Sequence, residues 1–84
     1  MQEPQLTASQ LRAARSVLGW SVDLLSKKTG VGTATIKRYE AAKGVPNSRK
    51  GHLETLGSCY EAAGIEFIGS PDDAPGIRIH SSLN

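Results

Sequence analysis

A short run of cationic and hydroxyl-bearing side chains is the part of this sequence best suited to recognise a ligand. Lys37 and Arg38 are adjacent, and Thr33 and Ala34 stand one helical turn before them. An arginine can donate two parallel hydrogen bonds to the O6 and N7 atoms of guanine, a lysine can reach the same edge or a phosphate, and a methyl group can contact thymine. These four residues are our candidates for contacts with base edges in double-stranded DNA.

Polar residues on both sides of this run are suited to bind phosphate. Ser21 precedes a predicted helix, whose first backbone N–H groups favour an anion. The other candidates for phosphate contacts are Thr35, Lys43, Asn47, Arg49 and Lys50. The hydroxyl of Thr35 could equally satisfy a free backbone group in the first turn of its helix. Lys27 and Lys28 could equally stabilise the dipole of the helix that they end.

The chain lacks the residue groupings that catalysis requires. His52 and His80 are isolated, and no carboxylate pair or glycine-rich phosphate loop is present. Cys59 is the only cysteine, which excludes an internal disulfide and a zinc site with two or more thiolates. We therefore predict no enzymatic activity, no metal and no cofactor, and we expect Cys59 to be a small buried residue.

Charge is distributed unevenly along the 84 residues, although the net charge is only +2. Residues 8–50 hold nine basic and two acidic residues, whereas residues 51–84 hold one basic and five acidic residues. A basic segment favours a polyanionic partner, and an acidic segment would repel the same partner. The acidic part is therefore the natural place for contacts with protein.

Length and hydropathy limit the class of protein. A chain of 84 residues forms one small core, and no apolar run approaches the roughly 20 residues of a membrane-spanning helix. Residues 1–5 are polar and lack the basic, apolar and small-residue order of a secretory signal. We expect a soluble, cytoplasmic, single-domain protein.

Capping signals divide most of the chain into helices. Thr7 and Gln10 have the spacing of a capping box, Ser21 is a second N-cap, and Gly19 and Gly30 can end helices in the left-handed conformation. The predicted helices cover residues 8–18, 22–29, 33–42 and 52–63.

The last part of the chain changes to alternating apolar and polar residues. Ile65 and Phe67, and later Ile77 and Ile79, flank the turn-forming run 69–76, which predicts a β-hairpin. An isolated hairpin is marginally stable in water. It must therefore pack on the helices or pair with another subunit.

The predicted second and third helices are separated by only three residues, which fits a helix-turn-helix motif whose second helix enters the major groove. In and around this motif the chain carries Arg15, Leu18-Gly19-Trp20-Ser21, Leu25, Gly30-Val31 and Thr35-Ile36-Lys37-Arg38-Tyr39-Glu40. With these residues the stretch 6–64 resembles the Cro/C1 (XRE) family of transcriptional regulators. The resemblance implies a mainly α, lambda-repressor-like DNA-binding domain of four to five short helices over residues 1–64. Residues 65–84 would add a C-terminal β-hairpin and tail, a possible dimerisation element.

The resemblance also implies roles for individual residues. The side chains expected in the core between the helices are Leu18, Trp20, Leu25, Ile36 and Tyr39. Arg15 and Glu40 are expected to form a structural ion pair between the first helix and the end of the third. The implied function is that of a sequence-specific repressor or autoregulator. Because one short helix contacts few base pairs, we expect a homodimer on half-sites about 34 Å, or a multiple, apart.

The sequence departs from the family at several positions. Val22 replaces a usual glutamine that braces the recognition helix and a phosphate, and Gly32 replaces a usual serine or threonine N-cap. The resemblance also implies that the loop over residues 47–52 is about two residues longer than in close relatives. Val17 and Leu24 stand at usually polar positions, so either the hairpin covers them or they belong to a subunit contact.

Two other functions remain compatible with the sequence. An antitoxin-like protein would regulate its own operon with the basic part and bind a toxin with the C-terminal part. An interaction module would have kept the fold and lost DNA binding. Val22 gives some support to this alternative, whereas Lys37 and Arg38 argue against it.

For the homodimer, we expect the two subunits to pair through their strands.

Overall fold

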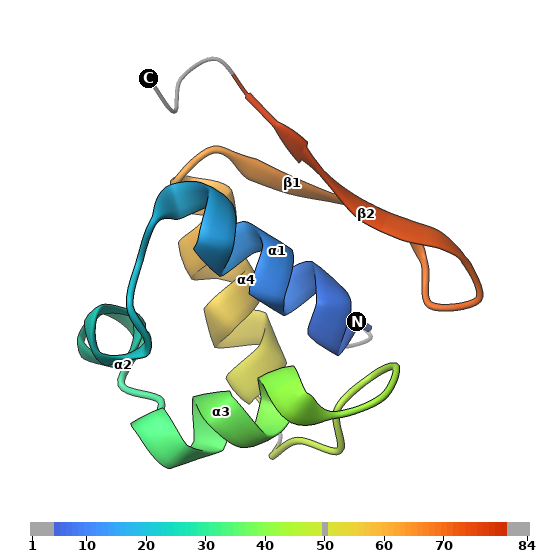
Figure 1. Ribbon diagram of the computed structural model, residues 1–84. Helices are drawn as coiled ribbons and strands as arrows, with labels where there is room; N and C mark the ends of the chain where they lie inside the picture. Colours follow the sequence, from blue (N-terminus) through green and yellow to red (C-terminus); the bar gives the residue numbers. More distant parts are fainter. Residues whose placement is uncertain (1–4, 50, 81–84) are drawn as a thin grey trace.

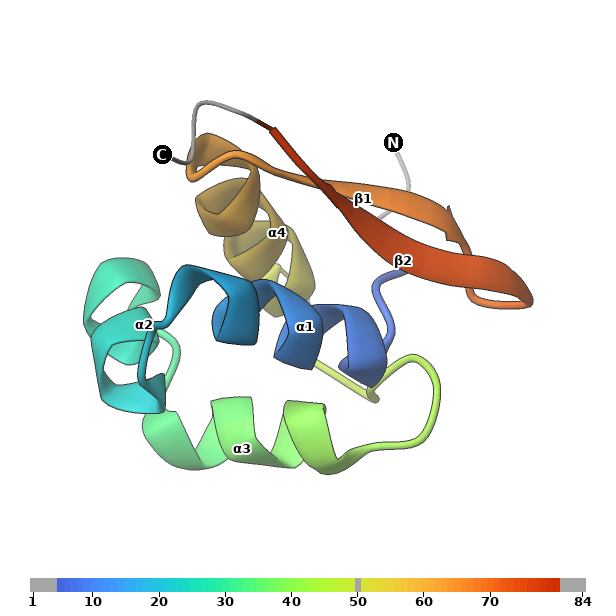
Figure 2. The same cartoon turned by 45° about the horizontal axis from the view of Figure 1, so that its top comes forward.

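The computed structural model describes residues 5–49 and 51–80. The elements in chain order are α1 (Ala8–Leu18), α2 (Val22–Thr29), α3 (Thr33–Ala41), α4 (His52–Ala62), β1 (Ile65–Ser70) and β2 (Asp73–Ile79). The prediction of a mainly α chain with a C-terminal hairpin is confirmed, with four helices in the described residues. In both views α1 lies between α3 and the hairpin (Figures 1 and 2). Lys50, a predicted phosphate contact, lies outside the described residues.

The caps of α1 and α2 follow the predicted pattern. The Thr7 hydroxyl accepts a hydrogen bond from the Gln10 backbone N–H at 3.1 Å, and the Gln10 side-chain oxygen accepts one from the Thr7 N–H at 2.9 Å. Gly19 and Gly30 end the two helices with φ of +69° and +79°, which glycine adopts without steric cost. Both helices therefore have the predicted bounds.

The other two helices each end one residue earlier than predicted. Ala42 is extended, and the chain then reaches Gly44, whose carbonyl accepts a hydrogen bond from the Ala8 N–H at 2.9 Å. This contact draws the chain away from the axis of α3 and towards the start of α1. At the end of α4, Ala63 is the C-cap.

The hairpin is longer than predicted. Its register pairs Ile65 with Ile79, Phe67 with Ile77, and Ser70 with Asp73, so the prediction of a turn over residues 69–76 was wrong. Gly69 forms a bulge with φ of +77°, and a Cβ there would lie 2.2 Å from the Ala74 carbonyl oxygen. Glycine is required at this position by a close backbone approach inside the ladder, which sequence alone does not distinguish from a turn.

The core joins all the helices to the hairpin. Its largest fully buried side chains are Leu11, Leu25, Ile36, Tyr39, Leu56, Tyr60 and Ile65. Trp20 stacks on Tyr60 with ring centroids 5.9 Å apart, and Phe67 meets the same tyrosine edge-on at 6.1 Å. Of the predicted core residues, Leu18 and Trp20 are only half-buried.

No helix in the described part of the chain is long and apolar enough to cross a membrane.

Gln10 attaches the hairpin to α1. Its amide nitrogen donates to the carbonyl oxygens of Ile68 and Gly76 at 3.1 and 2.8 Å. Because these carbonyls belong to β1 and β2, one side chain holds both strands. The hairpin thus packs on the helices of its own chain.

Candidate nucleic-acid interface

The turn between α2 and α3 consists of Gly30, Val31 and Gly32. Val31 is buried, and the Thr29 hydroxyl links the end of α2 to the turn by donating to the Leu25 carbonyl at 2.8 Å and accepting from the Val31 N–H at 3.2 Å. Leu25 and Ile36 are both in the core. Packing against the core therefore holds the turn in place and fixes the position of α3 relative to α2.

The outward face of α3 carries the predicted base-contact residues. Ala34, Lys37 and Arg38 are exposed and Thr33 is half-buried, whereas Ile36 and Tyr39 face the core. The α3 helix forms one outer side of the molecule (Figure 1). In the described residues neither Lys37 nor Arg38 has an ion-pair partner, so both charges remain available to an anionic ligand.

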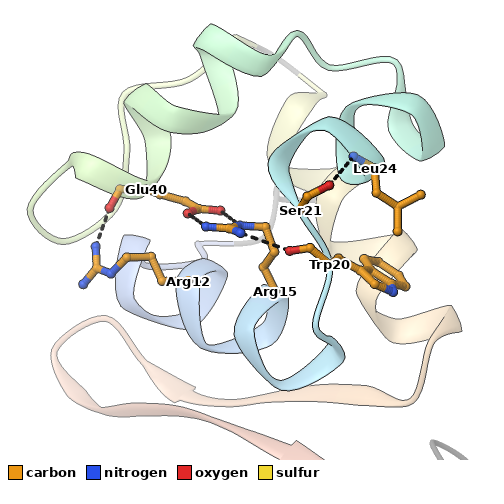
Figure 3. Close-up of polar contacts among 6 residues, drawn as sticks. All are labelled: Arg12, Arg15, Trp20, Ser21, Leu24 and Glu40. Carbon is orange, nitrogen blue, oxygen red and sulfur yellow. Dashed lines mark hydrogen bonds and ion pairs between the residues drawn. The ribbon is translucent and has the colours of Figure 1, made fainter.

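The inner side of α3 is joined to α1 by Arg15 and Glu40. The Arg15 Nε and Nη2 atoms each lie 2.7 Å from a Glu40 carboxylate oxygen, and Arg15 Nη1 donates to the Trp20 carbonyl at 3.0 Å (Figure 3). Arg12 donates to the Glu40 backbone carbonyl. The hydrogen bond with Glu40 raises the pKa of Arg15, a larger effect than the opposing desolvation. These contacts fix the end of α3 against α1.

The predicted phosphate-contact residues lie at separate places. Ser21 is exposed at the start of α2, where its hydroxyl accepts from the Leu24 N–H at 3.0 Å (Figure 3). Thr35 is half-buried in α3, and Lys43, Asn47 and Arg49 are exposed in the loop that follows. Asn47 and Arg49 share a hollow with Arg38, to which Lys43 and Ser21 do not contribute.

Val22, Val17 and Leu24, which are apolar where the Cro/C1 pattern is usually polar, have different environments. Val22 is half-buried and packs against the core, so a polar side chain there would give up packing. Val17 is 44% exposed and Leu24 40% exposed. The hairpin therefore leaves much of both side chains uncovered.

Lys28 lies against Trp20, and Cys59 lies against the core. The Lys28 ammonium lies 4.9 Å from the centre of the Trp20 ring, a cation–π contact. Cys59 is half-buried, not fully buried as predicted, and packs against the core from α4. Burial raises the pKa of its thiol, more than Lys28 lowers it, and a thiol in that form is a poor nucleophile.

The expectation that both histidines are isolated was wrong. The His52 Nδ1 atom lies 2.6 Å from the Tyr39 hydroxyl, which also accepts from the Arg49 N–H at 3.2 Å. His80 contacts Glu66 at 2.9 Å, and this hydrogen bond is the main reason why the pKa of Glu66 is lowered. Both contacts cross loops or strands, so helical periodicity contains no signal for them. The part of the chain that is described holds no cluster of three potential metal ligands.

Comparison of the chain with models of known protein families and with curated proteins found no match in either case.

Proposed function

We propose that this chain is a DNA-binding transcriptional regulator with a lambda-repressor-like fold, of the Cro/C1 type that residues 15–40 resemble. In this proposal α3 enters the major groove of double-stranded DNA. The observation that supports it best is the exposure of Lys37 and Arg38 on a helix whose opposite side is held by the core and by the ion pair between Arg15 and Glu40. A rigidly placed cationic helix on an outer side of the protein suits insertion into a groove.

The proposed base contacts come from the outward face of α3. They are Thr33, Ala34, Lys37 and Arg38. Arg38 would donate to guanine O6 and N7, a contact that discriminates against a wrong base by about 1–3 kcal/mol. The phosphate contacts would be made by Ser21, Thr35, Lys43, Asn47 and Arg49, and by Lys50 from outside the described residues.

The proposed regulator acts as a homodimer, in which the hairpin side of the molecule provides the contact. Ile79 is 53% exposed although it pairs with the buried Ile65. Val17 follows Gln10 by two turns of α1, on the face that Gln10 uses to hold the hairpin. Exposed apolar side chains at this place favour a protein contact. Because the acidic C-terminal part would repel DNA, the contact between the two subunits would lie on the side that faces away from the DNA.

Binding to duplex DNA at several salt concentrations tests the proposal. Each phosphate neutralised by a lysine or arginine steepens the fall of log K with log salt by about 0.9. We expect measurable binding of a mixed-sequence duplex, and a slope of log K against log salt of several units. Binding is measured by the fluorescence anisotropy of labelled DNA. Absence of binding at low salt, with the protein shown to be folded by circular dichroism, would contradict the proposal.

A further inference from the structure

The outward face of α2 has a small patch in which two lysines lie beside an exposed leucine. Leu24, Lys27 and Lys28 are three and four residues apart in the helix, a spacing that makes their side chains neighbours on one face. All three are exposed. Neither lysine has an ion-pair partner in the described residues. We call these three residues the α2 patch.

Part of the α2 patch is held in place. The Lys28 ammonium lies 4.9 Å from the centre of the Trp20 ring, which stacks on the buried Tyr60. A side chain that is already ordered loses less entropy on binding. Asp23, the acidic residue of α2, belongs to the first turn and pairs with neither lysine in the described residues. The patch therefore presents two positive charges that no carboxylate neutralises.

The end of the β-hairpin carries the opposite charge. Asp72 lies in the turn and Asp73 begins β2, and neither has an ion-pair partner in the part of the chain that is described. Ala74 and Pro75 follow, and all four residues are exposed. We call residues 72–75 the hairpin tip. Its two carboxylates and two small apolar side chains are complementary to the α2 patch.

The α2 patch and the hairpin tip lie at opposite ends of the molecule. In both views α2 is at one side, and the turn between β1 and β2 projects past the start of α1 at the other (Figures 1 and 2). The two surfaces therefore cannot meet within one chain. Complementary charges at two ends of a protein attract the unlike ends of separate copies and repel the like ends.

We propose that the α2 patch binds the hairpin tip of a second copy of this chain. The two carboxylates of the tip pair with the two ammonium groups of the patch, and the apolar side chains of the tip cover Leu24. Because the contact joins unlike surfaces, it is head-to-tail, and each added copy leaves one patch and one tip free. Ion pairs between exposed groups are individually weak, so the association is weak and sensitive to salt.

This contact is separate from the homodimer contact proposed above, which uses Val17 and Ile79. It leaves the outward face of α3 free, because its own residues belong to α2 and the hairpin. If the protein binds DNA as proposed, the contact would link copies on neighbouring sites, since attachment to one duplex raises their effective concentration. The contact itself needs no DNA.

Charge reversal on the full chain tests the contact. The tip variant combines Asp72→Lys with Asp73→Lys, and the patch variant combines Lys27→Glu with Lys28→Glu. The swapped variant carries all four changes and keeps the net charge of +2 of the parent. Circular dichroism shows whether each protein is folded.

The matched control combines Glu54→Lys with Glu61→Lys. Both glutamates are exposed on α4, and their replacement changes the net charge by the same amount as the tip variant does. Self-association is measured by sedimentation velocity without DNA over a range of protein concentrations. The measurement is made at about 0.01 M and about 1 M salt, where the Debye length is about 30 Å and about 3 Å.

The expected results differ between the variants. The sedimentation coefficient of the parent rises with protein concentration at low salt and not at high salt. In the tip and patch variants the association constant falls at least about tenfold, because like charges now face each other. The swapped variant regains the association of the parent, and the control associates more strongly than the tip variant.

Three results would overturn the proposal. The first is a parent that does not associate beyond its high-salt state at low salt, and the second is equal association in the tip variant and the control. The third is a patch variant that associates like the parent but has a smaller salt slope in DNA binding, which would assign the two lysines to DNA. If the swapped variant does not fold, the comparison of the tip variant with the control decides. Because sedimentation is measured without DNA, none of these results depends on the proposed function.

Discussion

Arg15 and Glu40 meet at two points, with both nitrogen-to-oxygen distances at 2.7 Å, and thereby join α1 to the last turn of α3. Their side chains are 26% and 9% exposed, so the pair is partly withdrawn from water. The pair faces inward while Lys37 and Arg38 face outward from the same helix. One side of α3 is thus occupied by stabilising contacts, and the other remains free for a ligand.

Glu40→Ala should destabilise the fold by leaving Arg15 without its partner. Loss of one partner costs 3–5 kcal/mol in a fully buried pair, and exposed pairs contribute about 0–1 kcal/mol. For this half-buried pair we expect a loss of about 2 kcal/mol in the free energy of unfolding, measured by urea denaturation with Trp20 fluorescence. Glu66→Ala, which breaks an exposed pair, is the control, and equal losses in the two variants would contradict the account.

Local signals in the sequence were sufficient for most of the backbone. The capping box of Thr7 and Gln10 and the glycines at 19 and 30 act within one or two turns, and α1 and α2 accordingly have their predicted bounds. The end of α3 depends on a hydrogen bond between Gly44 and Ala8, distant in sequence, and this end was misplaced.

The candidate interface likewise has features that local sequence predicts and features that it does not. Helical periodicity identifies which residues of α3 face outward, because that depends only on spacing. The hydrogen bonds of Tyr39 with His52 and Arg49 cross a loop, and the two carbonyls held by Gln10 come from strands more than fifty residues later. Such contacts depend on tertiary packing, and a single sequence carries no periodic signal for them.

Gln10→Glu should loosen the hairpin selectively. A carboxylate can still accept from the Thr7 N–H, but it cannot donate to the carbonyls of Ile68 and Gly76. A fully buried polar group without a partner costs about 1–3 kcal/mol, and these two carbonyls are partly buried. We expect faster amide hydrogen exchange in β1 and β2 and little change in α3.

Gln5→Glu is the matched control for this change, since Gln5 is exposed just before the same helix. Exchange that accelerates equally in the hairpin of both variants would show that added negative charge, and not the lost donor, is responsible.

Tyr60→Phe should stabilise the protein. The Tyr60 hydroxyl is buried and has no hydrogen-bond partner in the described residues, and an unsatisfied buried group costs about 1–3 kcal/mol. We expect a gain of about 1 kcal/mol at pH 7, measured by urea denaturation. Tyr39→Phe, which removes a hydroxyl that does have partners, should instead lower stability, and the same sign in both variants would contradict the account.

The stability of the parent should also fall at alkaline pH. Burial raises the pKa of Tyr60 well above its usual range, whereas a tyrosine in the unfolded chain ionises near pH 10. The titration of Tyr60 therefore leaves stability unchanged below about pH 10 and lowers it as pH rises above that value, because the phenol loses its proton more readily in the unfolded chain. Tyr60→Phe should lose less stability between pH 9 and about pH 11 than the parent, as followed by thermal unfolding. Identical pH profiles would count against the burial of this phenol.

Arg38→Ala and Lys43→Ala should affect DNA binding in different ways. Removal of a base contact by Arg38→Ala should relax base preference at one position, by about 1–3 kcal/mol of discrimination. Removal of a phosphate contact by Lys43→Ala should weaken all duplexes alike and reduce the salt slope by about one unit. The measurement is a competition among duplexes at several salt concentrations, and unchanged preference in Arg38→Ala would remove Arg38 from the base contacts.

Selection of bound duplexes from a randomised pool tests most directly whether α3 recognises a DNA sequence. We expect enrichment of a two-fold symmetric site whose half-sites are about 34 Å, or a multiple of that distance, apart. In Arg38→Ala we expect the preference to be lost at one position of each half-site and kept at the others. A pool that shows no enriched sequence after repeated selection by the folded protein would contradict the claim.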